Sequence, residues 1–195
     1  MLTLCLGLLV FLGVHAVQAL APQWRLQRIA QWGEGGYKGV YSLLSLLGLV
    51  LIVWGYGQAR LSPVIFWVAP KGLVHLSFVL MWAAMVLLVA AYVPGNHLKR
   101  RLGHPMTLGV KVWALGHWLV NGTLADALLF GGFLLWSVLV FRSARRRPAG
   151  AAPATPPKML STVLVVLIGS AVWVAFIGGL HTWLIGVSPM GRAAG

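Results

Sequence analysis

Long apolar runs separated by short polar stretches dominate this chain. A transmembrane helix needs about 20 mostly apolar residues, and about six runs approach that length. The runs are continuous rather than alternating, which favours helices over a barrel. We therefore expect an all-α fold, a polytopic transmembrane helix bundle of about six spans. The runs are approximately Met1–Ala21, Tyr41–Gly57, Leu73–Val93, Met106–Val120, Leu124–Phe141 and Leu160–Val187.

The composition supports a membrane protein. Of the 195 residues, 59% are hydrophobic and only 9% are charged. A soluble domain usually carries about 25% charged residues, so a soluble enzyme is excluded. Intrinsic disorder is excluded as well, because it requires low hydrophobicity. The lipid bilayer is therefore the expected main partner of this chain.

The runs form one expected unit. We found no repeat period typical of a solenoid, so a single transmembrane domain is expected over residues 1–190. Within it, the stretch ARRRPAGAAPATPPK at residues 144–158 is rich in Pro, Ala and basic residues. Such a composition predicts a flexible loop, here on the cytoplasmic side.

The charges predict the orientation. There are 15 basic and 2 acidic residues, a formal net charge of +13. Such basicity is also typical of nucleic-acid-binding proteins, but here the bases lie between apolar runs, as in loops beside anionic headgroups. We expect no nucleic acid partner. Six spans place eleven bases on one side, which is then cytoplasmic, and three on the other; both termini are expected to be periplasmic. The three are Arg60, Lys71 and Arg192.

The first run has a second interpretation. Its end at Ala19–Ala21 resembles a signal-peptidase site, although no basic segment precedes the run and Pro22 follows it. Cleavage there would leave five spans and remove His15.

Histidines are the main candidates for chemistry inside the spans. An ionisable group at membrane depth suggests function, through a proton relay or metal ligation. For a single histidine, a hydrogen bond between helices is the simpler interpretation. His97 lies in a polar loop and is expected to be solvated. The other five, in or near spans, are His15, His75, His104, His117 and His181.

Depth singles out one pair of histidines. Taking span midpoints near residues 11 and 115, His15 and His117 differ by only about 9 Å along the membrane normal. Two helices flanking a haem could each offer one imidazole at such depths. His75 and His181 form a second candidate cluster nearer the outer face, and His104 belongs to the cytoplasmic edge.

Composition restricts the cofactor. The only acids, Glu34 and Asp126, lie in different loops, which excludes paired-carboxylate chemistry. A single Cys5 allows neither an internal disulfide nor a cysteine-rich metal motif. A three-histidine zinc site stays open, without a supporting motif. A haem suits the chain better: it is apolar, it needs one or two axial histidines, and loop bases could meet its propionates. No Cys-x-x-Cys-His motif exists for covalent attachment.

Glu34 lies in an unusual Gly33-Glu34-Gly35 turn beside Lys38. The simpler interpretation is a tight turn in which Glu34 pairs with a nearby base. The alternative is that Glu34, the only acid on the predicted cytoplasmic side, orients a catalytic histidine.

Several stretches together resemble the NnrU family over nearly the whole chain. NnrU proteins are bacterial inner-membrane proteins associated with denitrification and nitric oxide metabolism. The stretches are FLGVHAVQALAPQWR (residues 11–25), GEGGYKGVYSLLSLLGLVLIVWGYGQAR (33–60), AAYVPGNHLKRRLGHPMTLGVKVWALGHWLVNGTLADALLFGGFLLW (90–136) and LHTWLIGVSP (180–189).

The resemblance implies a cofactor and its ligands. The family is similar to the plant zeta-carotene isomerase, which uses haem b with axial histidines to isomerise a cis double bond. By that resemblance, His15 and His117 are axial ligands of haem b. The isomerase has a cysteine three residues before the second histidine, where this chain has Ala114. The implied activities are redox or nitric oxide chemistry, or haem-dependent isomerisation of an apolar polyene.

The sequence leaves two other functions open. The segment Gly103–Gly109 is similar to the Arg-His-Pro segment of isoprenylcysteine carboxyl methyltransferases, but Gly103 replaces the arginine and no acid follows Asp126. The second alternative is a non-catalytic accessory or transport protein without haem, whose histidines pack helices or relay protons.

Overall fold

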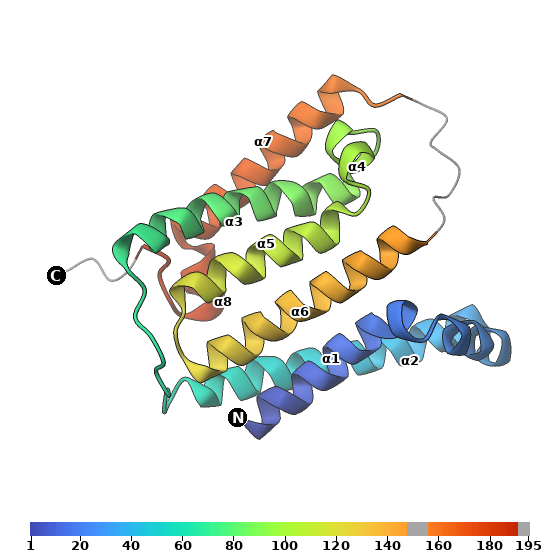
Figure 1. Ribbon diagram of the computed structural model, residues 1–195, viewed down its shortest axis with the longest axis horizontal. Coiled ribbons are helices and arrows are strands. Elements are labelled where there is room, and N and C mark those ends of the chain that lie inside the picture. Colours follow the sequence, from blue (N-terminus) through green and yellow to red (C-terminus); the bar gives the residue numbers. More distant parts are fainter. Residues whose placement is uncertain (148–155, 191–195) are drawn as a thin grey trace. The chain divides into compact units, whose positions relative to one another are not determined.

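Helices make up most of the structure (Figure 1). The computed structural model describes residues 1–147 and 156–190. In these residues the extended pairing is confined to an isolated antiparallel bridge between Ile65 and Thr123. The expected all-α fold is confirmed. The elements are α1 (Leu2–Leu20), α2 (Pro22–Ala59), α3 (Lys71–Tyr92), α4 (His97–Leu102), α5 (Pro105–Val120), α6 (Leu124–Arg146), α7 (Met159–Ala175), the π-helix η1 (Phe176–Leu180) and α8 (His181–Ile185).

Five helical stretches in the described residues are long and apolar enough to cross a membrane. They are α1, α2, α3, α6 and the continuous stretch Met159–Ile185. The remaining apolar run forms α5, which has 16 residues and therefore a length of about 24 Å. This is shorter than the roughly 30 Å hydrocarbon core, so the six expected runs become five full-length candidates and one short helix.

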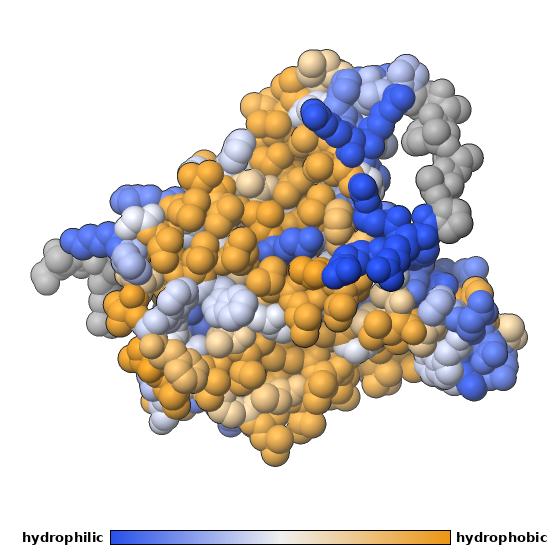
Figure 2. Space-filling view, viewed as in Figure 1, coloured by the Kyte–Doolittle hydropathy of each residue, from blue (hydrophilic) through white to orange (hydrophobic). Residues whose placement is uncertain are grey.

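The surface is apolar, as lipid contact requires. Figure 2 shows hydrophobic residues over most of the visible face. Large side chains such as Leu9, Val53 and Leu167 are 60–72% exposed. An exposed apolar surface of this extent is expected for a protein solvated by lipid. Helix length, composition and exposure together indicate a multi-pass membrane protein.

The described chain forms two compact units. The first contains residues 1–77 and 114–147, and the second contains residues 78–113 and 156–190. The expectation of a single domain over 1–190 stays a prediction. Most of the expected flexible loop, residues 148–155, lies outside the described residues.

Glycines bring α1 and α2 together in the first unit. A Cβ atom added at Gly7 would lie 2.6 Å from the Ile52 nitrogen, and one at Gly48 would lie 2.7 Å from the Phe11 nitrogen. A Cβ atom added at Gly55 would likewise collide with the backbone of Leu4. Small residues allow such close backbone approach between membrane helices. This contact fixes the antiparallel pair that carries the site described below.

The second unit is built around α3 and α7. Gly169 of α7 lies directly against the backbone of Val86 in α3. The Trp82 indole N–H donates to the Ser170 hydroxyl at 2.9 Å, and that of Trp173 donates to the Phe78 carbonyl at 3.1 Å. Hydrogen bonds between membrane helices of this kind stabilise by about 0.6 kcal/mol each, so they help to set the pairing of the two helices.

Candidate functional site

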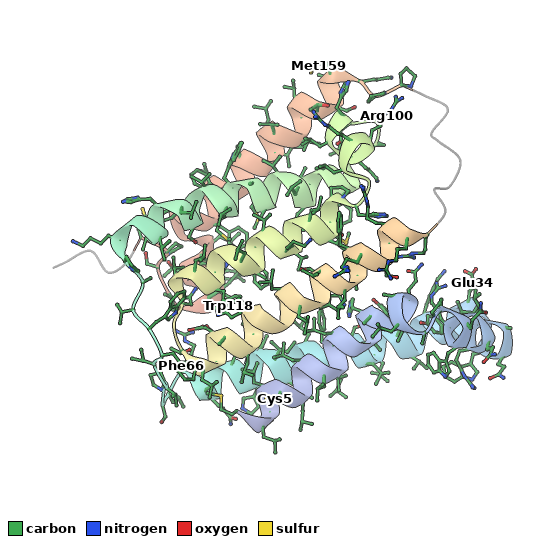
Figure 3. All side chains as sticks on the ribbon, viewed as in Figure 1. Cys5, Glu34, Phe66, Arg100, Trp118 and Met159 are labelled. Carbon is green, nitrogen blue, oxygen red and sulfur yellow. The ribbon has the colours of Figure 1, made fainter. Side chains whose placement is uncertain are left out.

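A sharp break in α2 creates a corner at one end of the α1–α2 pair. Gly33 has φ 71° and ψ 165°, a conformation inside the helix that is not helical and that is essentially restricted to glycine. The short helix at residues 22–32 therefore ends there, and the chain turns into the long segment that packs along α1. Figure 3 shows Glu34 at this corner and Cys5 toward the other end of α1.

The corner borders an open cavity of about 500 Å³. This volume lies within the range of about 300–1,000 Å³ that small-molecule and cofactor sites occupy. Three segments supply its walls: the last turns of α1, the 22–32 helix and the segment after Gly33. The lining residues are Val14, His15, Gln18, Arg25, Ile29, Glu34, Tyr37, Lys38 and Tyr41.

His15 is held in one orientation. Its Nδ1 atom lies 2.7 Å from the Phe11 carbonyl oxygen, and because a carbonyl only accepts, Nδ1 must carry the proton. The lone pair then belongs to Nε2. Donation of one ring N–H to a backbone carbonyl is the usual arrangement of a metal-ligating histidine. His15 therefore combines a defined tautomer with a place on the cavity wall.

Aromatic rings surround this imidazole. The ring of Phe11 stacks on it at 4.3 Å between centroids, Tyr41 lies at 5.2 Å, and Trp136 of α6 approaches edge-on at 6.4 Å. The Trp136 indole nitrogen is buried and has no hydrogen-bond partner in the described structure. These ring contacts restrict the rotation of the partly buried His15 side chain.

Charged residues also line the cavity. Lys38 Nζ donates to Glu34 Oε2 at 2.8 Å, and about three quarters of each side chain is exposed. The Arg25 guanidinium lies over the Tyr37 ring at 5.6 Å. Glu34 thus pairs with a nearby base, as the simpler interpretation of its turn predicted. It lines the same cavity as His15, but its side chain forms an ion pair with Lys38.

His117 lies in the same unit but not in this cavity. Its ring stacks on Phe130 of α6 at 4.8 Å, whereas His15 contacts Trp136. Six residues of helix separate Phe130 from Trp136 by about 9 Å of rise and about 120° of rotation. The two histidines therefore approach α6 at different levels and from different sides. Both histidines contact α6, but only His15 lines the cavity.

None of the other candidate histidines is among the residues that line this cavity. His75 is the fifth residue of α3, and the carbonyl of His104 accepts the Thr107 hydroxyl at the start of α5. His181 Nδ1 donates to the Val187 carbonyl at 2.7 Å, and His97 contacts the Thr162 hydroxyl. Over residues 1–147 and 156–190, no group of three or more His, Cys, Asp or Glu could hold a metal ion.

Sequence reasoning missed the buried network around Asp126. Its carboxylate accepts the Tyr56 hydroxyl at 2.5 Å and both the backbone N–H and the hydroxyl of Thr123, at 3.1 and 2.6 Å. The Thr123 and Asp126 pair forms a capping box at the start of α6. Thr-x-x-Asp before an apolar run is a readable signal for such a cap, but nothing local predicts the partner 70 residues earlier.

A second, smaller cavity of about 250 Å³ lies beside this network. Phe66 and Trp118, which Figure 3 shows close together, contribute to its walls. The Phe66 N–H donates to the Gly122 carbonyl at 2.8 Å, and a side chain at Gly122 would collide with Trp67. The cavity is bounded mainly by aromatic and small residues, so it has no group suited to acid–base chemistry.

Comparison with known proteins gives one match. No curated protein and no solved structure matches the chain. The model of one family, described as NnrU protein, matches residues 3–189. This match spans both units, the cavity at the α1–α2 corner and both histidines that approach α6. The chain belongs to the NnrU family.

Proposed function

We propose that this NnrU protein binds haem b in the cavity at the α1–α2 corner, with His15 as an axial ligand. The observation that carries the proposal is the Nδ1–H of His15 donating to the Phe11 carbonyl at 2.7 Å. This hydrogen bond leaves Nε2 as the nitrogen with a lone pair, which a metal requires. His15 also lines a cavity of suitable size.

The residues around His15 fit an apolar, anionic macrocycle. When bound, haem b supplies an iron that exchanges an electron or binds a small ligand. The rings of Phe11, Tyr41 and Trp136 contact the imidazole and restrict its rotation. Arg25 and Lys38 supply positive charge at the cavity. His15 holds the ligating nitrogen in place through its bond to Phe11.

His117 is proposed as the second axial ligand, which follows from the family resemblance rather than from the cavity. It reaches α6 from a different side than His15 does. The roles of His15 and His117 as ligands can therefore be tested separately. His15→Ala is expected to abolish haem binding. His117→Ala is expected to retain haem and to convert a six-coordinate spectrum into a five-coordinate one.

The test is an absorption spectrum of protein purified in detergent, oxidised and then reduced with dithionite, beside a pyridine haemochrome assay. We expect about one haem b per chain, lost in His15→Ala and retained in His97→Ala, the matched control whose histidine contacts Thr162 outside the cavity. Equal haem content in the wild type and both variants would contradict the proposal that His15 ligates the haem. A colourless, folded protein from haem-supplemented cells would favour the accessory or transport function without haem.

The cellular role proposed with this site is nitric oxide chemistry linked to denitrification in the bacterial inner membrane. Isomerisation of an apolar polyene is the second candidate, and it rests on the resemblance to the carotene isomerase. Titration of the reduced protein with nitric oxide and with a cis-polyene separates the two. A shift of the Soret band with the gas alone supports the first role, and product formation from the polyene supports the second.

A further inference from the structure

The positive charge at the α1–α2 corner is concentrated within the cavity. Arg25 and Lys38 both line it, and Glu34 is the only acid among the lining residues. The remaining lining residues are neutral: Val14, Gln18, Ile29, Tyr37 and Tyr41, besides His15. A cavity with this charge balance favours a ligand that carries negative charge at one end and is apolar elsewhere.

Lys38 lies about one helical turn from Tyr41, whose ring contacts His15. Tyr41, whose ring is 5.2 Å from His15, follows Lys38 by three residues, which is about 4.5 Å of rise. Residues three apart lie on neighbouring parts of one helix face. Arg25 stacks on Tyr37, from the turn that also carries Lys38. Both bases therefore border the same space as the imidazole, displaced along the helix.

One of the two bases already binds a carboxylate. Lys38 Nζ holds Glu34 Oε2 at 2.8 Å, and both residues line the cavity. This pair demonstrates that a carboxylate fits at Lys38 in this backbone geometry. Glu34 therefore occupies a position that the carboxylate of a ligand would also favour, and it competes for the lysine.

We propose that Arg25 and Lys38 bind the propionate carboxylates of haem b, and that Glu34 weakens this binding by competing for Lys38. This inference rests on the proposed haem site at His15. It adds that Arg25 and Lys38, which do not ligate the iron, determine how the haem is oriented in the cavity. Arginine and lysine are the usual donors to carboxylates, arginine through two parallel hydrogen bonds.

The test compares haem b with its dimethyl ester, which keeps the iron and macrocycle but has no free carboxylate. Haem-free protein, purified in detergent from haem-limited cells, is titrated with each at the Soret band. Arg25→Gln and Lys38→Gln should each lower the affinity for haem b about threefold, as expected for partly exposed charge pairs. The affinity for the ester should stay constant. Glu34→Gln should raise the affinity for haem b about twofold and leave the ester unaffected.

Arg28→Gln is the matched control on the same short helix. Arg28 lies over the rings of Trp24 and Trp32 and does not line the cavity. It should leave both affinities unchanged. Thermal melting of each variant, followed by circular dichroism, confirms that the helices remain folded.

The outcomes separate this inference from the function on which it rests. Equal losses for haem b and the ester would mean that the bases act through the fold, which overturns the inference. Unchanged haem b affinity in Arg25→Gln and Lys38→Gln, with binding abolished in His15→Ala, would overturn it while the haem site stands. Wild-type protein that binds neither compound would overturn both proposals together.

Discussion

At the scale of single residues, the two acids of this chain have different tasks. Glu34 is exposed and pairs with Lys38 beside the cavity. Asp126 is 5% exposed, and its two oxygens accept hydrogen bonds from Tyr56 and Thr123. A buried carboxylate is tolerated only when hydrogen bonds satisfy it, and here the bonds also join α2 to the start of α6. We therefore interpret Asp126 as structural.

Removing this carboxylate should destabilise the first unit. Asp126→Ala leaves the Tyr56 hydroxyl and the Thr123 backbone N–H and hydroxyl without an acceptor, so the free energy of unfolding should fall by about 2–3 kcal/mol. Tyr56→Phe removes one donor and should cost about 1 kcal/mol. Unfolding in mixed micelles, followed by circular dichroism, measures both. Tyr92→Phe, at a 75% exposed tyrosine, is the control and should stay within about 0.5 kcal/mol of the wild type.

At the scale of elements, glycine determines how closely α1 and α2 approach. The backbone of Phe11 lies where a side chain at Gly48 would project. Gly57, on the same helix, has no atom within 4 Å of an added Cβ. The same substitution is therefore expected to cause a steric clash at Gly48 and none at Gly57.

Gly48→Leu should separate the two helices and lower the free energy of unfolding by about 2 kcal/mol or more, because overpacked contacts force the backbone to shift. Gly57→Leu should have little effect or a slightly stabilising one, since leucine is the better helix former. Thermal melting in detergent compares them. Similar melting temperatures for the two variants would contradict the proposed role of close backbone packing.

The elements were predictable from the sequence because apolar runs long enough to span a membrane are a strong signal. The length of α5 and the corner at Gly33 were harder to read. The length of α5 depends on Pro105 at its start and on the polar turn after Val120 at its end. The corner depends on a backbone conformation at Gly33 that glycine allows but does not require. Depth along the chain put His15 and His117 at similar levels. It carries no information on rotation about a helix axis, so it could not show that they reach α6 from different sides.

At the scale of the whole molecule, the distribution of bases predicts how the chain crosses the membrane. The bases near the corner should lie in the cytoplasm, and the segment after α2 should face the periplasm. The two ends of α2 test this directly, because the apolar segment after Gly33 connects the corner to the segment after α2.

Single cysteines placed in a Cys5→Ser background should report this orientation. Ser62→Cys should react with a membrane-impermeant maleimide in intact spheroplasts, whereas Gln31→Cys should react only after the membrane is opened. Both positions are in the described structure outside the apolar centre of α2. The reverse labelling pattern would place the cavity at the periplasmic end and overturn the predicted topology.

The 22–32 helix is bounded by a break at each end, at Ala21 and at Gly33. Its residues Arg25 and Ile29 line the cavity, while the glycine contacts of α1 and α2 lie elsewhere. Exchange of this short helix would therefore alter what the cavity recognises without disturbing membrane insertion or helix pairing. Substitutions in this short helix are therefore expected to change ligand preference while the packing of α1 against α2 stays the same.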